Sequence, residues 1–293
     1  MASSSQSTDT TLDHIGIVSR DMELLRNAYV KLGFTVTTPV PLMQSTSDGK
    51  LNQWIGQYSS HIVFSDSYLE LSAVPPEVTD NHLLGWLAKR DGLHIIALRT
   101  DDAEQSSAHL GRAFPPKLEL RAASRRISAG GVEGTARFTW FMLPEPLGRV
   151  ALACMVQHHT PDLVFVKTLM HHPNGALGLQ SLRAIVSEPA KAGEQYAALP
   201  GAEVTRRGFD FHVRLGDREI VLMEAAEFAC HFPGVRAPEV PSVGSFALTV
   251  DSVVDTSAFL ATQRVSFEES AEGIWVKPEH AGGVVLEFVS KSS

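Results

Sequence analysis

The stretch Leu12-Asp13-His14-Ile15-Gly16-Ile17-Val18-Ser19-Arg20-Asp21 decides the fold of this chain. It is typical of a short apolar strand, with a histidine near its start and an aspartate at its end. The pattern returns as Leu93-His94-Ile95-Ile96-Ala97-Leu98-Arg99-Thr100-Asp101, and in both copies the histidine stands seven residues before the aspartate. Because a buried strand rarely carries a histidine, this repetition predicts a repeat protein in which His14 and His94 bind one metal ion.

Each copy opens a unit with the order strand, helix and three strands. In the first unit Asp21 suits a helix N-cap and Gly33 a helix end. Strands are expected near residues 34–37, 58–64 and 68–74, and residues 65–67 are expected to form a tight turn. The second unit is expected to have a helix over 102–110, a basic loop containing Arg121, Arg125 and Arg126, and strands near 132–143 and 150–157.

Two further units begin near residues 179 and 245. Counting back seven residues from the acid that ends the opening strand gives Ser181 and Gly244, neither of which is a useful metal ligand. We therefore expect a disordered N-terminus over residues 1–11, a first domain with the metal site over 12–160, a connector over 161–178 and a degenerate second domain over 179–293.

The last strands of the units supply the acidic candidates. Glu70 and Glu287 each stand between large apolar residues, whereas Ala153 occupies the matching place in the second unit. A buried carboxylate is costly unless it neutralises a cation. His14, Glu70 and His94 thus predict a site for one divalent ion, and two imidazoles with one carboxylate suit Fe²⁺, Mn²⁺, Ni²⁺, Co²⁺ or Zn²⁺.

Two more histidines are candidates for a further ligand or a catalytic base. If the turn is Asp66-Ser67, Val63 pairs with Glu70, and His61 lies diagonal to Glu70 on the face toward the metal. A slip of one residue would send His61 to the opposite face. His158 follows the strand that lacks an acid.

Composition excludes several classes of protein. The net charge of −8 and the absence of a basic stripe argue against nucleic acid as a partner. No apolar run is long enough to span a membrane, the polar first residues do not resemble a secretion signal, and the two cysteines have no disulfide or zinc spacing. We expect a cytoplasmic protein with a small-molecule substrate and a possible homodimer.

The chain resembles the vicinal oxygen chelate superfamily, and within it the glyoxalase-like domain family. The resemblance rests on the Leu12-Asp-His-Ile motif, Leu32-Gly-Phe, Ser67-Tyr-Leu-Glu-Leu71, the connector Gln157-His-His-Thr-Pro-Asp162, and His172-Pro-Asn-Gly-Ala176. It implies an α+β fold in which four βαβββ modules pair into two half-open barrels. It also implies that the first-strand histidines and the last-strand Glu70 are metal ligands, although Ala153 departs from relatives that supply a second glutamate.

The resemblance implies a metal-dependent lyase or isomerase of the glyoxalase type, with His61 or His158 moving a proton on a small oxygen-chelating substrate. An Fe²⁺ ring-cleaving dioxygenase is one alternative, and a protein that binds a small molecule or antibiotic without turning it over is another. His14 and His94 could also be satisfied core histidines, and Glu70 could face solvent at a sheet edge. For Glu287, His212 and His280 the structural interpretation is favoured.

Overall fold

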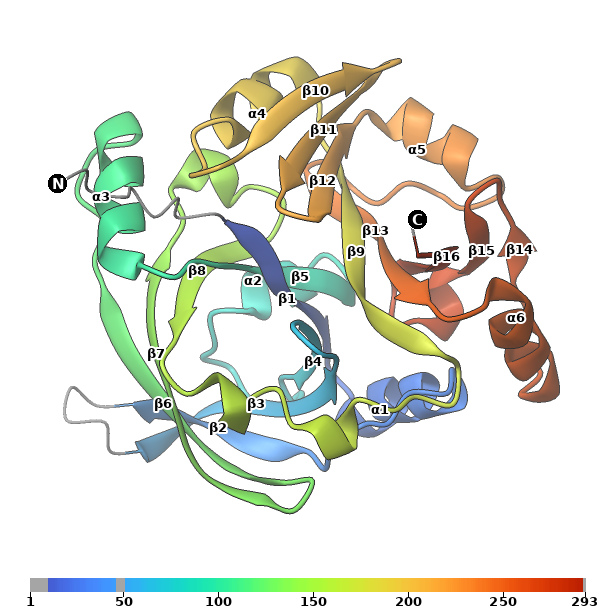
Figure 1. Cartoon of the computed structure of the whole chain (residues 1–293), viewed down its shortest axis with the longest axis horizontal. Coiled ribbons are helices and arrows are strands. Elements are labelled where there is room, and N and C mark those ends of the chain that lie inside the picture. The colour runs from blue at the N-terminus through green and yellow to red at the C-terminus, as the bar shows by residue number, and fades with distance from the viewer. Residues whose placement is uncertain (1–9, 46–50, 292–293) are drawn as a thin grey trace, which may run out of the picture.

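The computed structural model describes residues 10–45 and 51–291 and contains two eight-stranded sheets, of which the first curls almost into a barrel (Figure 1). The first sheet contains β1 (Thr11–Ser19), β2 (Val40–Ser45), β3 (Leu51–Val63), β4 (Tyr68–Ala73), β5 (Gly92–Arg99), β6 (Arg121–Ala129), β7 (Val132–Met142) and β8 (Leu152–His158). The second contains β9 (Ala176–Ile185), β10 (Glu203–Arg207), β11 (Asp210–Leu215), β12 (Arg218–Met223), β13 (Ser242–Val250), β14 (Glu268–Glu269), β15 (Gly273–Val276) and β16 (Val285–Ser290). The helices are α1 (Met22–Lys31), α2 (Leu84–Leu87), α3 (Ala103–Ala113), α4 (Pro189–Tyr196), α5 (Ala225–His231) and α6 (Val253–Thr262).

The two sheets repeat one strand order. It runs β2-β3-β4-β1-β5-β8-β7-β6 in the first sheet and β10-β11-β12-β9-β13-β16-β15-β14 in the second. At each centre the opening strands of two modules pair antiparallel, β1 with β5 and β9 with β13, and each is flanked by a parallel closing strand. This arrangement confirms the predicted α+β fold of four βαβββ modules in two pairs.

Local sequence signals set the first two long helices. The Asp21 carboxylate accepts a hydrogen bond from the Leu24 N–H at 2.9 Å, and Asp102 accepts one from the Gln105 N–H at 2.8 Å. Each bond satisfies one of the N–H groups that a helix start leaves unpaired. Helix α1 then buries Leu25 and Tyr29 against the sheet. The predicted helix over residues 102–110 is α3.

The predicted basic loop is in fact a strand. Residues 121–129 form β6 and pair along their whole length with β7, so Arg125 lies in a sheet. Gly130 and Gly131 connect the strands with φ values of 61° and 81°. A Gly-Gly pair with positive φ at both positions forms the tight turn that suits a hairpin, and it joins β6 to β7.

The register between β3 and β4 also differs from the prediction. His61 pairs directly with Glu70 and Val63 with Tyr68, so the turn between the strands is longer than expected. The shift is two residues, and side chains alternate faces with a period of two. His61 and Glu70 therefore still share a face, as predicted.

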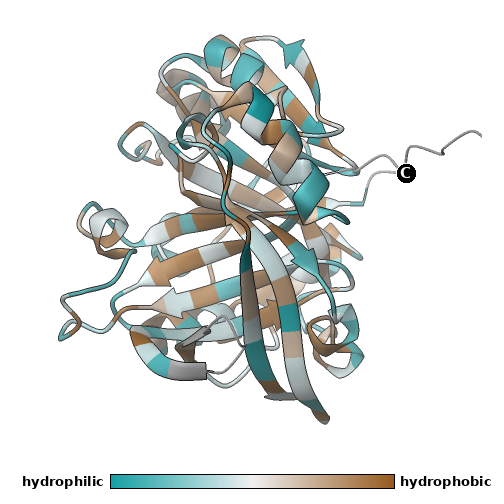
Figure 2. Cartoon of the chain, turned by 90° about the vertical axis from the view of Figure 1, so that its left-hand side faces the viewer, coloured by the Kyte–Doolittle hydropathy of each residue, from teal (hydrophilic) through white to brown (hydrophobic). Residues whose placement is uncertain are grey.

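One hydrophobic core extends across both sheets and includes Leu12, Tyr29, Phe141, Phe246 and Phe288. Figure 2 shows hydrophobic and hydrophilic residues alternating along several strands, as expected for strands with two unlike faces. The connection between β8 and β9 packs on the first module. There His172 Nδ1 accepts from the Thr35 N–H at 3.1 Å, and Asn174 donates to the Leu32 carbonyl at 2.9 Å. The two halves are thus packed as one body.

The N-terminal disorder predicted for residues 1–11 lies outside the described residues except at Thr10 and Thr11, where Thr11 begins β1. Within the part of the chain that the structure describes, no helix is both long and apolar enough to cross a membrane.

Candidate functional site

Two irregularities in the β1–β5 pair determine where the opening-strand side chains point. The register passes from Leu12 opposite Leu98 to His14 opposite Ala97, which leaves Asp13 as an extra residue. A bulge of this kind redirects side chains and is common next to active sites. It allows the adjacent side chains of Asp13 and His14 to contact each other.

A buried carboxylate holds two imidazoles. Asp13 Oδ2 lies 2.8 Å from His14 Nδ1, and Asp13 Oδ1 lies 3.0 Å from Nε2 of His158, at the end of β8. Burial by itself would raise the pKa of Asp13, but the hydrogen bonds from both histidines hold it well below its usual range. Because an ionised carboxylate only accepts, His14 Nδ1 and His158 Nε2 are the donors. With Nδ1 engaged by Asp13, Nε2 is the nitrogen of His14 that remains for a second partner.

The free side of His14 faces β4. Its Nε2 lies 3.4 Å from the Tyr68 hydroxyl and 3.9 Å from Glu70 Oε2. The rings of His14 and Tyr68 are stacked, with centroids 4.2 Å apart and an interplanar angle of 16°. Burial, followed by the negative charge of Asp13, raises the pKa of Tyr68 well above its ordinary value, so the hydroxyl keeps its proton at neutral pH. A protonated hydroxyl thus lies beside His14 Nε2.

Glu70 is bound on one side by hydroxyl groups. Ser59 donates to its Oε1 at 2.6 Å and Ser72 does so at 2.7 Å. Burial would raise the pKa of Glu70, but the opposite charge of Arg125, with further contributions from His61 and His14, lowers it to about 2. Glu70 is therefore buried as an anion in an environment that stabilises its charge, and it does not face solvent at a sheet edge.

His61 is paired with a cation. Arg125 Nη1 on β6 lies 2.5 Å from His61 Nε2 on β3, and the guanidinium is the donor. Burial, together with the positive charge of Arg125, lowers the pKa of His61 to about 3. The imidazole is therefore neutral at physiological pH, and Arg125 occupies one of its nitrogens.

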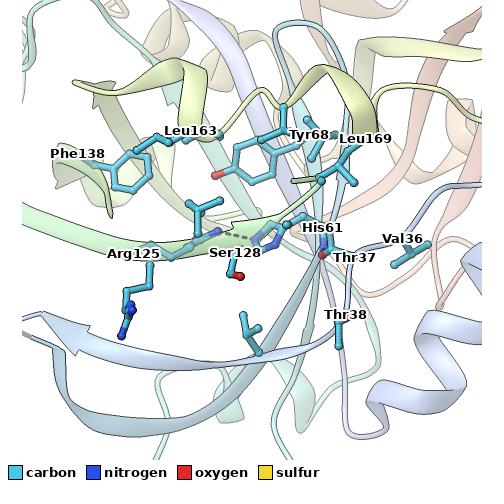
Figure 3. Close-up of a pocket in the computed structure, with 18 residues that line it drawn as sticks. Val36, Thr37, Thr38, His61, Tyr68, Arg125, Ser128, Phe138, Leu163 and Leu169 are labelled. Carbon is cyan, nitrogen blue, oxygen red and sulfur yellow. Dashed lines mark hydrogen bonds between the residues drawn. The ribbon is translucent and has the colours of Figure 1, made fainter. Parts of the chain in front are cut away.

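These groups meet a cavity of about 320 Å³ inside the first sheet (Figure 3). His61, Tyr68 and Arg125 reach its surface from β3, β4 and β6. Its remaining lining is mostly apolar or hydroxylic: Val36, Thr37, Thr38, Val40, Val63, Arg126, Ile127, Ser128, Ala129, Gly130, Phe138, Leu163, Val164, Val166 and Leu169. A concave apolar site with a few convergent polar groups and shifted pKa values is the expected form of a small-molecule site.

His94 does not join this group, contrary to the prediction. The register passes from Gly16 opposite Ile95 to Ile17 opposite Leu93 and skips His94, which lies at the second bulge. Its ring packs on Trp86, with centroids 5.7 Å apart, and its Nε2 donates to the Arg90 carbonyl at 2.8 Å. Burial lowers the pKa of His94 to about 4. His94 is the satisfied core histidine of the alternative interpretation.

The predicted ligand set for a divalent ion, His14, Glu70 and His94, is therefore not assembled. His14 and Glu70 alone are close together, and within residues 10–45 and 51–291 no group of three histidine, cysteine, aspartate or glutamate side chains could hold a metal. The second unit has Ala153 at the place that matches Glu70, and the cation next to Glu70 is the guanidinium of Arg125. The donors present do not fit the predicted metal site.

The second sheet stabilises its buried acid in another way. Glu287 on β16 pairs with Arg183 on β9 and accepts from the Ser245 hydroxyl at 2.9 Å. The guanidinium also lies 5.5 Å from the Phe232 ring centroid. An internal cation thus neutralises Glu287, which supports the structural interpretation of this residue. His212 and His280 contact Glu219 and Ser266.

Paired βαβββ modules around a cavity define this chain as a protein of the vicinal oxygen chelate superfamily. Residues 12–200 match the glyoxalase-like domain, and the chain belongs to that family. Among proteins with curated functions, a sequence search finds no match.

Solved structures share the fold at low sequence identity. A hypothetical protein from Staphylococcus aureus has a TM-score of 0.64 at 9% identity, with 96% of this chain and 100% of that one covered. A mutant of 4-hydroxymandelate synthase from Streptomyces coelicolor has a TM-score of 0.56 at 14% identity, with 98% and 95% covered. An Mn(II)-bound glyoxalase from Novosphingobium aromaticivorans has a TM-score of 0.57 at 12% identity, with 97% and 83% covered. At these identities the likeness shows the fold alone.

Three residues of the site were not predicted from the sequence. Asp13 stands next to His14 in the first motif, but its side chain reaches the histidine only because of the bulge. Tyr68 lies two residues before Glu70, so the alternation of a strand places both on one face. Arg125 was assigned to a loop, and reading Gly130-Gly131 as a hairpin turn would have placed it in a strand opposite β7.

Proposed function

We propose that the first sheet forms the active site of a lyase or isomerase of the glyoxalase type, which transfers a proton on a small oxygen-bearing molecule bound in the cavity. The contact between Tyr68 and His14 carries this proposal. The Tyr68 hydroxyl belongs to a cavity-lining residue, His14 Nε2 lies 3.4 Å from it, and the other nitrogen of His14 is held by Asp13. A hydroxyl, an imidazole and a buried carboxylate in this order are the elements of an activated proton-transfer group.

In the proposed step Tyr68 takes a proton from a substrate carbon next to a carbonyl while its own proton passes to His14 Nε2. The Asp13 carboxylate stabilises the imidazolium that forms. Return of a proton to the neighbouring carbon or oxygen completes an isomerisation and regenerates all three groups without gain or loss of electrons. The 3.4 Å contact must shorten toward the range of about 2.6–3.2 Å for transfer, and such contacts tighten when substrate binds.

His61 and His158, predicted as proton-transfer residues, have other parts in this proposal. Arg125 occupies His61 Nε2, so His61 helps to hold the guanidinium. His158 shares Asp13 with His14 and packs against Phe138, a lining residue of the cavity, with ring centroids 5.1 Å apart. We assign both to positioning.

The predicted divalent ion has no part in the proposed step, because its ligand set is not assembled. The predicted ring-cleaving dioxygenase has the same weakness, since it too depends on those ligands. A protein that binds a small molecule without changing it remains the rival from another class, and the experiment below separates it from an enzyme.

Hydrogen exchange with solvent tests the proposal. The protein, treated with a chelator, is incubated in D₂O with methylglyoxal, phenylglyoxal or phenylpyruvate, and proton NMR follows exchange at the carbon-bound positions and any new product. We expect exchange or product with the wild type and a loss of about 10²–10⁴-fold in Tyr68→Phe. Tyr58→Phe, which removes a hydroxyl from β3 outside the cavity lining, should behave as the wild type.

Two results would contradict the proposal. Activity that is abolished by the chelator and restored by Mn²⁺, Fe²⁺ or Zn²⁺ would show that an ion supplies the chemistry. Binding of these compounds without exchange or product would support the binding protein.

A further inference from the structure

The charged side chains that line the cavity are both positive. Arg125 and Arg126 both line the cavity, and no aspartate or glutamate is among its lining residues. This is unusual in a chain whose net charge is −8. Because an apolar surround weakens dielectric screening, a guanidinium at the surface of such a cavity attracts an anion more strongly than it would in open water.

The nearest buried acid leaves Arg125 able to bind an anion. Glu70 lowers the net positive charge around Arg125, but its carboxylate lies behind the lining and already accepts from Ser59 and Ser72. A guanidinium carries five N–H donors in a planar fork, and His61 takes one of them. The fork geometry matches the two oxygens of a carboxylate.

The rest of the lining defines the body of the ligand. Phe138, Leu163, Val164, Val166 and Leu169 supply an apolar surface, and Figure 3 shows Phe138, Leu163 and Leu169 around the same space as Arg125 and Tyr68. A cavity of about 320 Å³ lies at the small end of the range for ligand sites, which is roughly 300–1,000 Å³. One anionic group on a compact apolar body fits this lining.

We propose that the substrate is a small carboxylate with an aromatic or branched apolar body, and that Arg125 binds its carboxylate while His61 holds the guanidinium in place. This inference rests on the proposed function, since it names the class of substrate for the same cavity. It places the carboxylate at Arg125, on β6, and the reacting carbon next to the Tyr68 hydroxyl, on β4.

Calorimetric binding measurements test the inference apart from catalysis. The probes are phenylacetate, benzoate and 3-methylbutanoate, and phenylacetamide is the neutral match for the first. We expect the carboxylates to bind at least tenfold more tightly than the amide, and Arg125→Gln to weaken phenylacetate binding by about 10- to 100-fold. Arg125→Lys keeps the charge but loses the fork and should recover only part of the affinity.

The matched control is Arg121→Gln. Arg121 lies on the same strand, is exposed and bonds Glu119, and it does not line the cavity, so its replacement should leave binding unchanged. Circular dichroism of each variant confirms that it is folded. Equal affinity for phenylacetate and phenylacetamide, no effect of Arg125→Gln, or no binding of any of the three carboxylates by folded protein would overturn the inference.

The two proposals can fail separately. If carboxylates bind through Arg125 but Tyr68→Phe does not change exchange, the proton-transfer function is wrong and the binding inference stands. If methylglyoxal is turned over in a Tyr68-dependent way but no carboxylate binds, the function stands and the substrate class is wrong.

Discussion

His158 Nε2 donates to Asp13 Oδ1 at 3.0 Å, although the two residues are 145 positions apart and lie on β8 and β1. The second module thereby holds the carboxylate that orients His14 in the first. His158 Nδ1 is buried and has no hydrogen-bond partner among the described residues. Within that part of the chain, the hydrogen bond from Nε2 to Asp13 is therefore the polar contact that holds this ring. The site depends on both modules even though most cavity-facing polar groups come from the first.

Asp13→Asn should disturb both imidazoles at once. An amide can accept one hydrogen bond through its oxygen but presents an N–H group to the second histidine. We expect a fall of about 10²–10⁴-fold in the exchange activity and a loss of about 1–3 kcal/mol in the free energy of unfolding. The downfield imidazole N–H signals of His14 and His158, followed by NMR, should shift or vanish.

Asp21→Asn is the control for Asp13→Asn, because Asp21 caps α1 and asparagine caps a helix equally well. Unchanged imidazole N–H signals and full activity in Asp13→Asn would show that the carboxylate does not position His14.

Arg218→Met tests how the second sheet supports the first. The side chain of Arg218, on β12, is 4% exposed, and it donates to the Leu12 carbonyl and pairs with Asp66 in the β3–β4 turn. Leu12 directly precedes the bulge at Asp13, so the hydrogen bond to its carbonyl fixes the backbone of β1 where the site residues Asp13 and His14 begin. Loss of these bonds should lower the free energy of unfolding by about 1–3 kcal/mol in urea denaturation.

Arg214→Met removes an arginine from the neighbouring strand, where it pairs with Glu203 on the surface. Exposed pairs contribute about 0–1 kcal/mol, so this variant should be nearly as stable as the wild type. Equal stability of the Arg218 and Arg214 variants would contradict the supporting role of Arg218.

Arg183 and Glu287 should behave as a coupled pair in the second sheet. Arg183→Met leaves a buried carboxylate without its cation, which costs about 3–5 kcal/mol. The double variant Arg183→Met/Glu287→Leu removes both charges and should recover much of that loss. Thermal and urea unfolding of the single and double variants measure the coupling energy, and additive losses would argue against a buried ion pair.

Acid should begin to destabilise the protein at pH values well above those at which carboxylates titrate. Burial lowers the pKa of His61 to about 3 and those of His94 and His172 to about 4, whereas unfolded histidine titrates near 6.5. Below pH 6.5 the unfolded state therefore binds protons that the folded state does not. The free energy of unfolding should decrease as the pH is lowered from 6.5 to about 4. Depression of the Glu70 pKa from 4.5 to about 2 acts in the same direction at lower pH.

Urea denaturation at pH 7.5, 6.0 and 5.0 measures this dependence. The ring C–H signals of His61, His94 and His172 should not titrate above pH 5 in the folded protein. A stability that is flat between pH 7.5 and 5.0 would mean that these rings are not held neutral by the fold.

The sequence by itself was sufficient to predict the βαβββ modules. A histidine seven residues before an aspartate, repeated in two apolar stretches, identified β1 and β5, and the cap at Asp21 identified the start of α1. Hydrophobic periodicity and capping act over a few residues, so they can be read from local sequence. Alternation along a strand likewise placed His61 and Glu70 on one face, despite an error of two residues in their register.

Only the tertiary structure decided which of the candidate residues meet. His14 and His94 occupy equivalent places in the sequence, but bulges at Asp13 and at His94 turn one toward Tyr68 and the other toward Trp86. Whether an extra residue is accommodated at one position of a strand pair depends on the packing of both strands and on the elements that cover them. That packing is set by residues far apart in the chain, and for this reason the pairing of Asp13 with His158 and of His61 with Arg125 could not be read from local patterns.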